Sequence, residues 1–103
     1  MQNQPTKWIV ITGCSTGLGR SLVGAMRRQG WGVVATARRL ETLSNLPNEQ
    51  DIFKVALDVL SDDSVRLAVQ QCQHLRIVGL INNAGYGQVG PLEYITTQEN
   101  KKY

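Results

Sequence analysis

The chain has 103 residues, of which 42% are hydrophobic and 18% charged, so length and composition predict one small globular domain rather than a disordered segment. The formal net charge is +3, but the basic stretch 20–39 lacks an aromatic platform or a helix-turn-helix pattern, so we expect no nucleic-acid partner. The longest apolar run, 31–37, is too short to span a membrane, and the polar N-terminus shows no signal peptide, so we expect a cytoplasmic protein with no membrane partner.

Four short apolar runs without polar alternation predict strands that are buried on both faces of a sheet. These runs occupy residues 8–11, 32–37, 52–57 and 77–81. After the first run, Leu18, Leu22 and Met26 recur at a spacing of four residues and predict a helix that extends to about Gln29. Gly30 follows and is suited to end this helix.

Two further helices are expected between the later strands. A short helix covers residues 40–46 and ends at Pro47. The other begins at Ser61, which is a favourable cap, and Asp62 and Asp63 follow it at the positive end of the helix dipole. The expected buried stripe of this helix consists of Val65, Ala68, Val69 and Cys72.

The order of the elements is β-α-β-α-β-α-β, in which helical crossovers join parallel strands and cover both faces of the sheet. We therefore predict an α/β fold with a Rossmann-type doubly wound parallel sheet of strand order 3-2-1-4. The predicted sheet is incomplete, because it contains only the first four strands. It forms a single partial domain over residues 1–103, with its core in 7–85 and a loop and polar tail in 86–103.

The segment 12–19 after the first predicted strand has the features of a phosphate-binding loop. Gly13 suits a tight turn off the strand, while Gly17 and Gly19 permit a close approach of backbone to phosphate or of helix to strand. The glycine spacing is G-x3-G-x-G, which differs from the common G-x-G-x-x-G fingerprint, and a flexible strand-to-helix turn is the alternative. The predicted pyrophosphate site, which includes two hydroxyl donors, comprises Gly13, Ser15, Thr16, Gly17, Leu18 and Gly19.

This loop and the segment Asn83-Ala84-Gly85, after the fourth predicted strand, resemble the motifs of the short-chain dehydrogenase/reductase family. The family pattern Thr-Gly-x-x-x-Gly-x-Gly begins at Thr12, and the resemblance covers about residues 7–97. It implies that the loop binds the pyrophosphate of a dinucleotide cofactor. It also implies that Asn83, Ala84 and Gly85 support the central sheet and lie against the adenosine end of the cofactor. Asn83 would otherwise be structural, bonding backbone at the end of the sheet.

The residues after the second predicted strand indicate which dinucleotide binds. An NAD site usually places an acid here to hold the ribose hydroxyls, whereas this chain has Ala37 followed by Arg38 and Arg39. A guanidinium binds a 2′-phosphate through two charge-assisted hydrogen bonds, so we expect NADP as the cofactor, with NADPH preferred over NADH. We assign Arg38 to the 2′-phosphate, while Arg39 either stacks on adenine or points to solvent. The alternative is that both arginines only solvate a loop.

Asp58 and Val59 follow the third predicted strand. By resemblance to the family, Asp58 accepts a hydrogen bond from the adenine amino group and Val59 contacts the adenine ring. The alternative role for Asp58 is to cap the turn into the next helix.

Proton transfer in this family uses a tyrosine with a lysine four residues later. Tyr86, Tyr94 and Tyr103 are not followed by such a lysine, so none is assigned as catalytic and we expect this chain alone to be inactive. The apolar strand 77–81 would form an exposed edge that invites self-association, so we interpret the chain as a fragment or as one completed by a partner. The expected function is the NADP(H)-binding portion of an oxidoreductase for a small alcohol or carbonyl substrate. The alternative is a non-catalytic nucleotide-sensing or interaction module.

Three other side chains, Cys14, Cys72 and His74, are of types that can form redox or metal sites. Cys14 lies in the loop at a helix N-terminus, where a thiol pKa falls, so it is either redox-reactive or a small residue that fills the loop. The pattern favours the second interpretation, and Cys72 is expected in the core of its helix. His74 has no second ligand nearby in the sequence, and the two cysteines have no zinc or disulfide spacing, so we expect no metal site.

Overall fold

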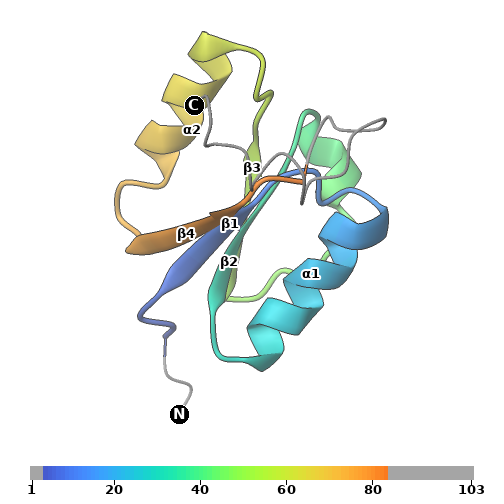
Figure 1. Ribbon diagram of the computed structural model, residues 1–103, viewed down its shortest axis with the longest axis vertical. Coiled ribbons are helices and arrows are strands. Elements are labelled where there is room, and N and C mark those ends of the chain that lie inside the picture. Colours follow the sequence, from blue (N-terminus) through green and yellow to red (C-terminus); the bar gives the residue numbers. More distant parts are fainter. Residues whose placement is uncertain (1–3, 84–103) are drawn as a thin grey trace.

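A computed structural model of the protein describes residues 4–83, which form a four-stranded parallel sheet with helices on both faces (Figure 1). The strand order is β3-β2-β1-β4, as the sequence predicts. The strands are β1 (Trp8–Ile11), β2 (Gly32–Ala37), β3 (Ile52–Ala56) and β4 (Ile77–Ile81). The Rossmann-type arrangement is therefore confirmed for these four strands.

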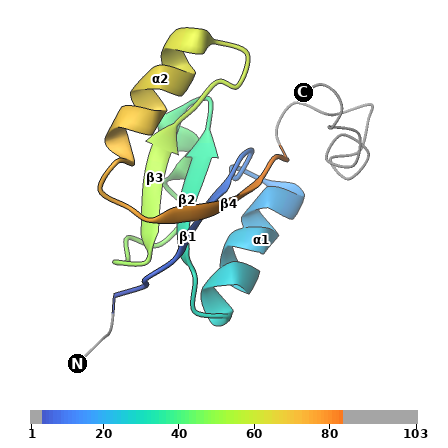
Figure 2. The same ribbon diagram turned by 60° about the vertical axis from the view of Figure 1, so that its left-hand side comes forward.

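Helix α1 (Gly17–Arg28) and the 3₁₀ helix η1 (Leu40–Leu43) pack on one face of the sheet, and helix α2 (Asp62–Gln71) packs on the other (Figure 2). Successive strand residues point to opposite faces, so the central strands supply side chains to two separate cores. The core under α1 and η1 contains Ile9, Ile11, Cys14, Val23, Val33, Ala35, Ala37, Leu43, Leu46 and Ile52. The core under α2 contains Trp8, Val34, Val55, Ala68 and Cys72.

The predicted signals for the helix ends operate as expected. Gly30 has a positive φ of 90° and donates its N–H to the Arg27 carbonyl at 2.9 Å, which ends α1. The Ser61 hydroxyl accepts the N–H of Ser64 at 3.2 Å and caps the N-terminus of α2.

The short helix after β2 is smaller than predicted. It was expected over residues 40–46, but η1 ends at Leu43 and has 3₁₀ rather than α geometry. The Ser44 N–H donates to the carbonyl of Glu41, three residues earlier, which is the 3₁₀ pattern. Leu43 and Leu46 are both buried, so two anchors three residues apart determine the path of this segment, and Pro47 is not what ends the helix.

The predicted buried stripe of α2 is only half correct. Ala68 and Cys72 are buried, but Val65 is 39% exposed and Val69 59% exposed. Successive residues of an α-helix are rotated by about 100° around its axis. Val65 and Val69 directly follow Ser64 and Ala68, so they lie on the flank of the helix rather than on the face toward the sheet. No element among residues 4–83 covers this flank, and the prediction for Val65 and Val69 is therefore wrong.

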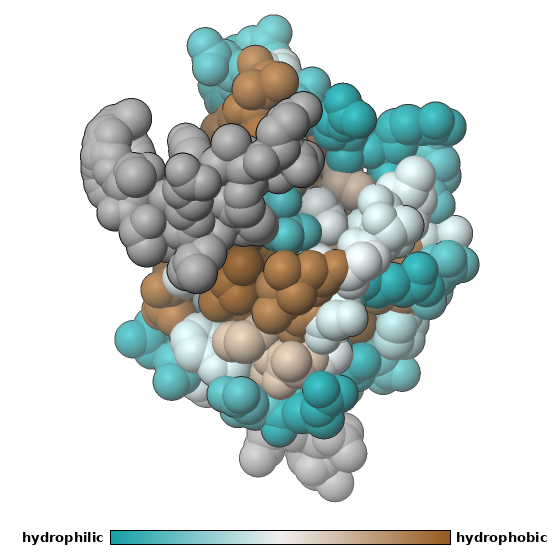
Figure 3. All heavy atoms as spheres, turned by 45° about the vertical axis from the view of Figure 1, so that its right-hand side comes forward, coloured by the Kyte–Doolittle hydropathy of each residue, from teal (hydrophilic) through white to brown (hydrophobic). Residues whose placement is uncertain are grey.

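Strand β4 pairs with β1 and forms one edge of the sheet within the described residues. Its side chains Ile77, Val78 and Leu80 are exposed, which agrees with the apolar edge expected from the sequence. Figure 3 shows a continuous hydrophobic area on one face of the molecule, bordered by hydrophilic residues. None of the helices within 4–83 has the length and hydrophobicity that a membrane span requires. The loop and tail predicted for residues 86–103 lie outside the described residues.

We expect Leu43→Ala to lower the free energy of unfolding by about 2–5 kcal/mol, because Leu43 is fully buried between η1 and the sheet. Leu67→Ala is the matched control, since Leu67 is exposed on α2, and it should change stability by less than about 0.5 kcal/mol. Urea unfolding followed by circular dichroism measures both. Equal effects of the two substitutions would contradict the packing of η1 described above.

Candidate functional site

The loop between β1 and α1 is held in one conformation by two glycines and by β2. Gly13 and Gly17 have φ angles of 70° and 62°, which residues with a side chain rarely adopt. Between them, the Cys14 N–H donates to the Thr36 carbonyl at 2.8 Å, and the Cys14 thiol donates to the Ile11 carbonyl at 3.1 Å. The loop is thus attached to the adjacent strand and to the end of β1 through Cys14.

Gly19, in the first turn of α1, allows the helix to approach this loop closely. A Cβ atom at Gly19 would lie 2.1 Å from the Gly13 carbonyl oxygen and 2.8 Å from Nδ2 of Asn83. Neither distance is compatible with a side chain, and the nearest atom belongs to backbone. Gly19 is therefore required for the packing of α1 against the loop.

The Thr12 side chain connects the carboxyl ends of β1 and β4. Its hydroxyl donates to Oδ1 of Asn82 at 3.1 Å and accepts the Asn83 N–H at 2.7 Å. The Asn83 side chain donates from Nδ2 to the Gly13 carbonyl at 3.3 Å. The two sequence motifs that carry the family resemblance therefore bond directly to each other. The hydrogen bond from Asn83 Nδ2 to the Gly13 carbonyl is the structural role expected for Asn83 as an alternative, bonding backbone at the end of the sheet.

The two long helices have different N-termini. At α2, the Ser61 hydroxyl accepts the Ser64 N–H, and two aspartates occupy the first turn. At α1, the first turn contains no acid, and within the described residues the Thr16 side chain makes no capping hydrogen bond. The positive end of the α1 dipole is therefore not neutralised by its own side chains, which is the arrangement that binds an external anion.

A cavity of about 550 Å³ lies at the carboxyl ends of the strands, beside the N-terminus of α1. Residues that follow each of the four described strands line it, so the topology brings together segments far apart in the sequence. Its lining consists of Gly13, Ser15, Thr16, Ala37, Arg38, Leu57, Asp58, Val59, Leu60 and Asn83. The cavity is at the position where Rossmann-type sheets bind ligands.

A second hollow, of about 650 Å³, lies at the opposite end of the sheet. Its lining includes Arg27 and Asp51, which form an ion pair with 2.9 Å between Nε and Oδ2. This hollow has no glycine loop and no helix N-terminus at its border, and its partly buried cation, Arg27, is already paired. The cavity at the carboxyl ends is therefore the stronger candidate for a ligand site, although it is the smaller one.

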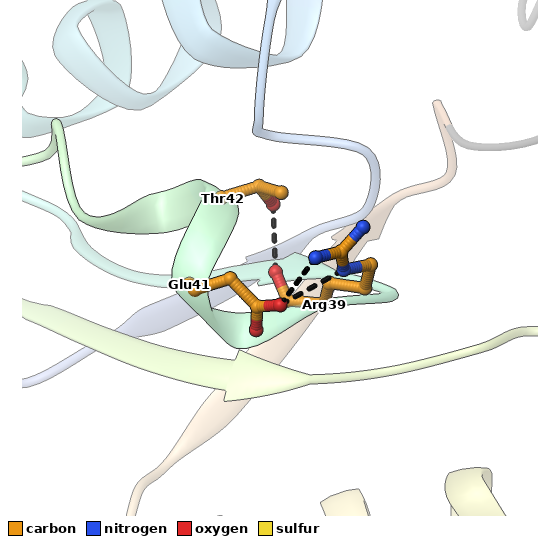
Figure 4. A network of polar contacts seen from close by, with 3 residues as sticks. All are labelled: Arg39, Glu41 and Thr42. Atoms are coloured by element: carbon orange, nitrogen blue, oxygen red, sulfur yellow. Dashed lines mark hydrogen bonds and ion pairs between the residues drawn. The ribbon is translucent and has the colours of Figure 1, made fainter.

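The two arginines after β2 are both exposed but are placed differently. Arg38 lines the cavity, whereas Arg39 does not. The Arg39 guanidinium contacts Oε2 of Glu41 through Nε at 2.8 Å and through Nη2 at 2.7 Å (Figure 4). The backbone N–H of Glu41, followed by Arg39, lowers the pKa of the Glu41 carboxyl below its ordinary value of 4.5.

Asp58 caps a turn and also lines the cavity. Its Oδ1 accepts the Leu60 N–H at 3.0 Å, and its backbone N–H donates to the Ser64 hydroxyl at 2.8 Å. The capping role that the sequence left as an alternative is thus present. Only Oδ1 takes part in it, so the carboxylate is held in a fixed orientation at the wall of the cavity.

The Cys14 thiol is enclosed by the protein and is not at a surface that solvent reaches. Cys14 is completely buried, and this burial raises the pKa of its thiol from an ordinary 9.0 to about 11, although the Thr36 backbone acts in the opposite direction. The lowered pKa expected at a helix N-terminus is therefore wrong, because burial outweighs the helix dipole. Cys14 is the small residue that fills the loop.

Seven of the predicted site residues border the same cavity, namely Gly13, Ser15, Thr16, Arg38, Asp58, Val59 and Asn83. Gly17 and Gly19 shape the loop without lining the cavity, and Leu18 is exposed. Among residues 4–83, no group of three or more His, Cys, Asp and Glu side chains is arranged to hold a metal ion.

Two apolar residues of the cavity wall, Leu57 and Leu60, are not among the site residues predicted from the sequence. They flank the pair that was predicted to hold adenine, and an apolar Leu60 directly before a helix cap was the available signal. The predicted residues Ala84 and Gly85 lie outside the described part of the chain.

Comparison with known proteins gives a consistent result. A family model for short chain dehydrogenases matches residues 7–103. The chain is 40% identical over 99 residues to oxidoreductase BOA17 of Botryotinia fuckeliana, covering 91% of this chain and 36% of the relative. It is 39% identical over 83 residues to an NADPH-dependent 1-acyldihydroxyacetone phosphate reductase of Schizosaccharomyces pombe, covering 77% and 28%.

Solved structures agree with this match. A short chain dehydrogenase from Bacillus anthracis is similar with a TM-score of 0.70 and 31% identity, over 79% of this chain and 35% of that one. In these comparisons the chain spans about a third of the length of the proteins it matches.

We expect Gly19→Ala to destabilise the chain by more than about 3 kcal/mol, because the new methyl group would overlap the Gly13 carbonyl, an extreme case of overpacking. Gly17→Ala is the matched control: its Cβ meets no atom within 4 Å, so only the positive φ is costly, at about 1–2 kcal/mol. Urea unfolding of both variants measures the difference. Similar costs would show that α1 does not approach the loop as closely as described.

The free energy of unfolding is expected to fall as pH rises from about 9 to about 11. The Cys14 thiol loses its proton near 9.0 when exposed by unfolding but near 11 when folded, so the folded chain holds more protons in this window. Urea unfolding over this range should show a larger loss of stability in the unmodified chain than in Cys14→Ala, in which the Cys72 thiol, whose pKa burial also raises, still contributes. Parallel pH profiles for the two proteins would mean that the thiol is not desolvated.

Proposed function

The chain belongs to the short-chain dehydrogenase family, and on that basis we propose that it is the NADP(H)-binding portion of an oxidoreductase acting on an alcohol or carbonyl substrate. The observation that carries the proposal is the N-terminus of α1, which has neither an acid in its first turn nor a side-chain cap among the described residues. It stands over a glycine loop at the edge of a cavity, where a pyrophosphate would meet several backbone N–H donors.

The residues of the loop fit a dinucleotide pyrophosphate. Gly13 and Gly17 adopt conformations that expose backbone N–H groups, and Ser15 and Thr16 add hydroxyls at the cavity wall. Gly19 keeps the helix N-terminus close to the loop. The nicotinamide dinucleotide, when bound, donates or accepts the hydride of the reaction. The role of these residues is to bind and orient it.

The adenosine end of the cofactor is assigned to the segment after β3. Asp58 lines the cavity and its Oδ1 accepts the Leu60 N–H, so we assign its carboxylate to accept a hydrogen bond from the adenine amino group. Val59 and Leu57 supply apolar surface for the ring. Asn83 borders the same cavity from the end of β4, and Ala84 and Gly85 are assigned to this side by the family resemblance alone.

The preference for NADP over NAD rests on the end of β2. Ala37 stands where an NAD site usually has an acid, so no carboxylate would repel a 2′-phosphate there. The Arg38 guanidinium borders the cavity and has no ion-pair partner within residues 4–83. The similar reductase from S. pombe is described as NADPH-dependent, which supports the same preference.

No residue of this chain is assigned to proton transfer. Neither Tyr86 nor Tyr94 is followed four residues later by a lysine, so the proposal assigns this portion to cofactor binding. Self-association through the exposed β4 edge and a cytoplasmic location stay predictions.

We expect Arg38→Asp to weaken NADPH binding by more than about tenfold and NADH binding by less than about threefold, because only NADPH carries the 2′-phosphate that pairs with the guanidinium. Calorimetric titration with each dinucleotide at equal, low salt measures both affinities. Arg28→Asp is the matched control: it makes the same charge change at the far end of α1 and should leave both affinities unchanged. An equal loss for NADPH and NADH would refute the contact.

A further inference from the structure

The two arginines that follow β2 are not equivalent. Arg38 lines the cavity and has no ion-pair partner among the described residues, whereas Arg39 lies outside the cavity lining and is bound to Glu41. Both guanidiniums are carried by adjacent residues of the same exposed segment. Of the two, only Arg39 is paired with a carboxylate within residues 4–83, and that carboxylate belongs to Glu41.

Arg39 is held at both its side chain and its backbone (Figure 4). Nε and Nη2 converge on the single oxygen Oε2 of Glu41, at 2.8 and 2.7 Å. The Arg39 carbonyl accepts hydrogen bonds from the Thr42 N–H at 3.0 Å and from the Thr42 hydroxyl at 2.7 Å. The first turn of η1 thus fixes the geometry of the pair, because Glu41 and Thr42 belong to it.

The ion pair is also weak enough to be exchanged. The side chains of Arg39 and Glu41 are 74% and 65% exposed, and water and salt reduce the attraction between exposed charges. A phosphate carries more charge than a carboxylate and offers more acceptor oxygens, so a phosphate nearby competes for the same guanidinium. Arg39 is thus a second cation, adjacent in the chain to the cavity-lining Arg38, that is paired with an intramolecular carboxylate.

We infer that Glu41 is a positioning residue that limits the preference for NADP(H), because it holds Arg39 away from the cavity and leaves Arg38 as the principal guanidinium for the 2′-phosphate. This inference rests on the proposed function. Removal of the Glu41 charge releases Arg39, which then pairs with the 2′-phosphate as well. NADH has no such phosphate and gains nothing.

The test is a double-variant cycle with NADPH and NADH as the probes, using calorimetry on the full chain at one low salt concentration. Glu41→Gln should strengthen NADPH binding about threefold, the size expected for an exposed ion pair, and leave NADH binding unchanged. Arg39→Gln alone should change NADPH binding by less than about twofold, because Glu41 already occupies this arginine. In the variant carrying both substitutions the gain should disappear.

Glu49→Gln is the matched control, since it removes the same charge from an exposed glutamate at the opposite end of the sheet. It should leave both affinities unchanged. A gain with Glu41→Gln that persists without Arg39, or no gain at all, overturns the inference while the proposed function stands. A tenfold loss with Arg39→Gln alone also overturns it, because Arg39 would then already bind the phosphate. Absence of NADPH binding or of an NADPH preference in the unmodified chain overturns the proposed function, and this inference with it.

Discussion

The position of the candidate site depends on the hydroxyl of Thr12, which joins the carboxyl ends of β1 and β4. Helix α1 follows β1 on one face of the sheet, helix α2 precedes β4 on the other, and the cavity lies at the carboxyl ends of the strands. The Thr12 hydroxyl bonds both Asn82 and Asn83 and joins the ends of β1 and β4 at this place. From this junction Asn83 reaches the Gly13 carbonyl, which places the glycine loop over the crevice.

The candidate site has two parts with different physical properties: the loop after β1, which is bonded to its neighbours, and the exposed segment that begins with Arg38. The loop is bound to β2 through Cys14 and adjoins the buried core. It also has no room for a side chain at position 19, which is why a glycine stands there. It can supply fixed backbone donors for a phosphate that every nicotinamide dinucleotide carries. The segment that begins with Arg38 lies beyond the buried strand, where side chains are free to differ without disturbing the core. Under the proposed function, the buried loop would supply affinity for the part of the cofactor that all dinucleotides share, and the exposed segment would discriminate between them.

The strands and their order follow from the sequence because buried parallel strands are encoded by local apolar runs, and right-handed crossovers leave few alternatives for their arrangement. The features that were mispredicted depend on neighbours that a local pattern does not contain. Val69 matches a buried helical stripe, yet it lies on a flank that no described element covers. The pKa of Cys14 is determined by complete burial, which opposes the helix dipole that the sequence indicates. Glu41, which pairs with Arg39, lies in the first turn of η1. The sequence predicted a longer helix over residues 40–46 here and did not indicate this ion pair.

Under the proposed function, the separation of the loop from the exposed segment also explains why cofactor selectivity is easier to change than binding of the pyrophosphate. A substitution at Gly19 or Thr12 changes the fold and the phosphate loop together, because both residues connect elements of the core. A substitution at Arg38 or Glu41 changes only exposed charges, whose individual contributions to stability are small. Weak interactions suffice here because selectivity is a difference between two affinities that share the same loop, so the strong contacts cancel. Under the proposed function, the balance of charge beyond β2, including the Glu41 carboxylate that pairs with Arg39, is therefore where the preference between dinucleotides is expected to be set.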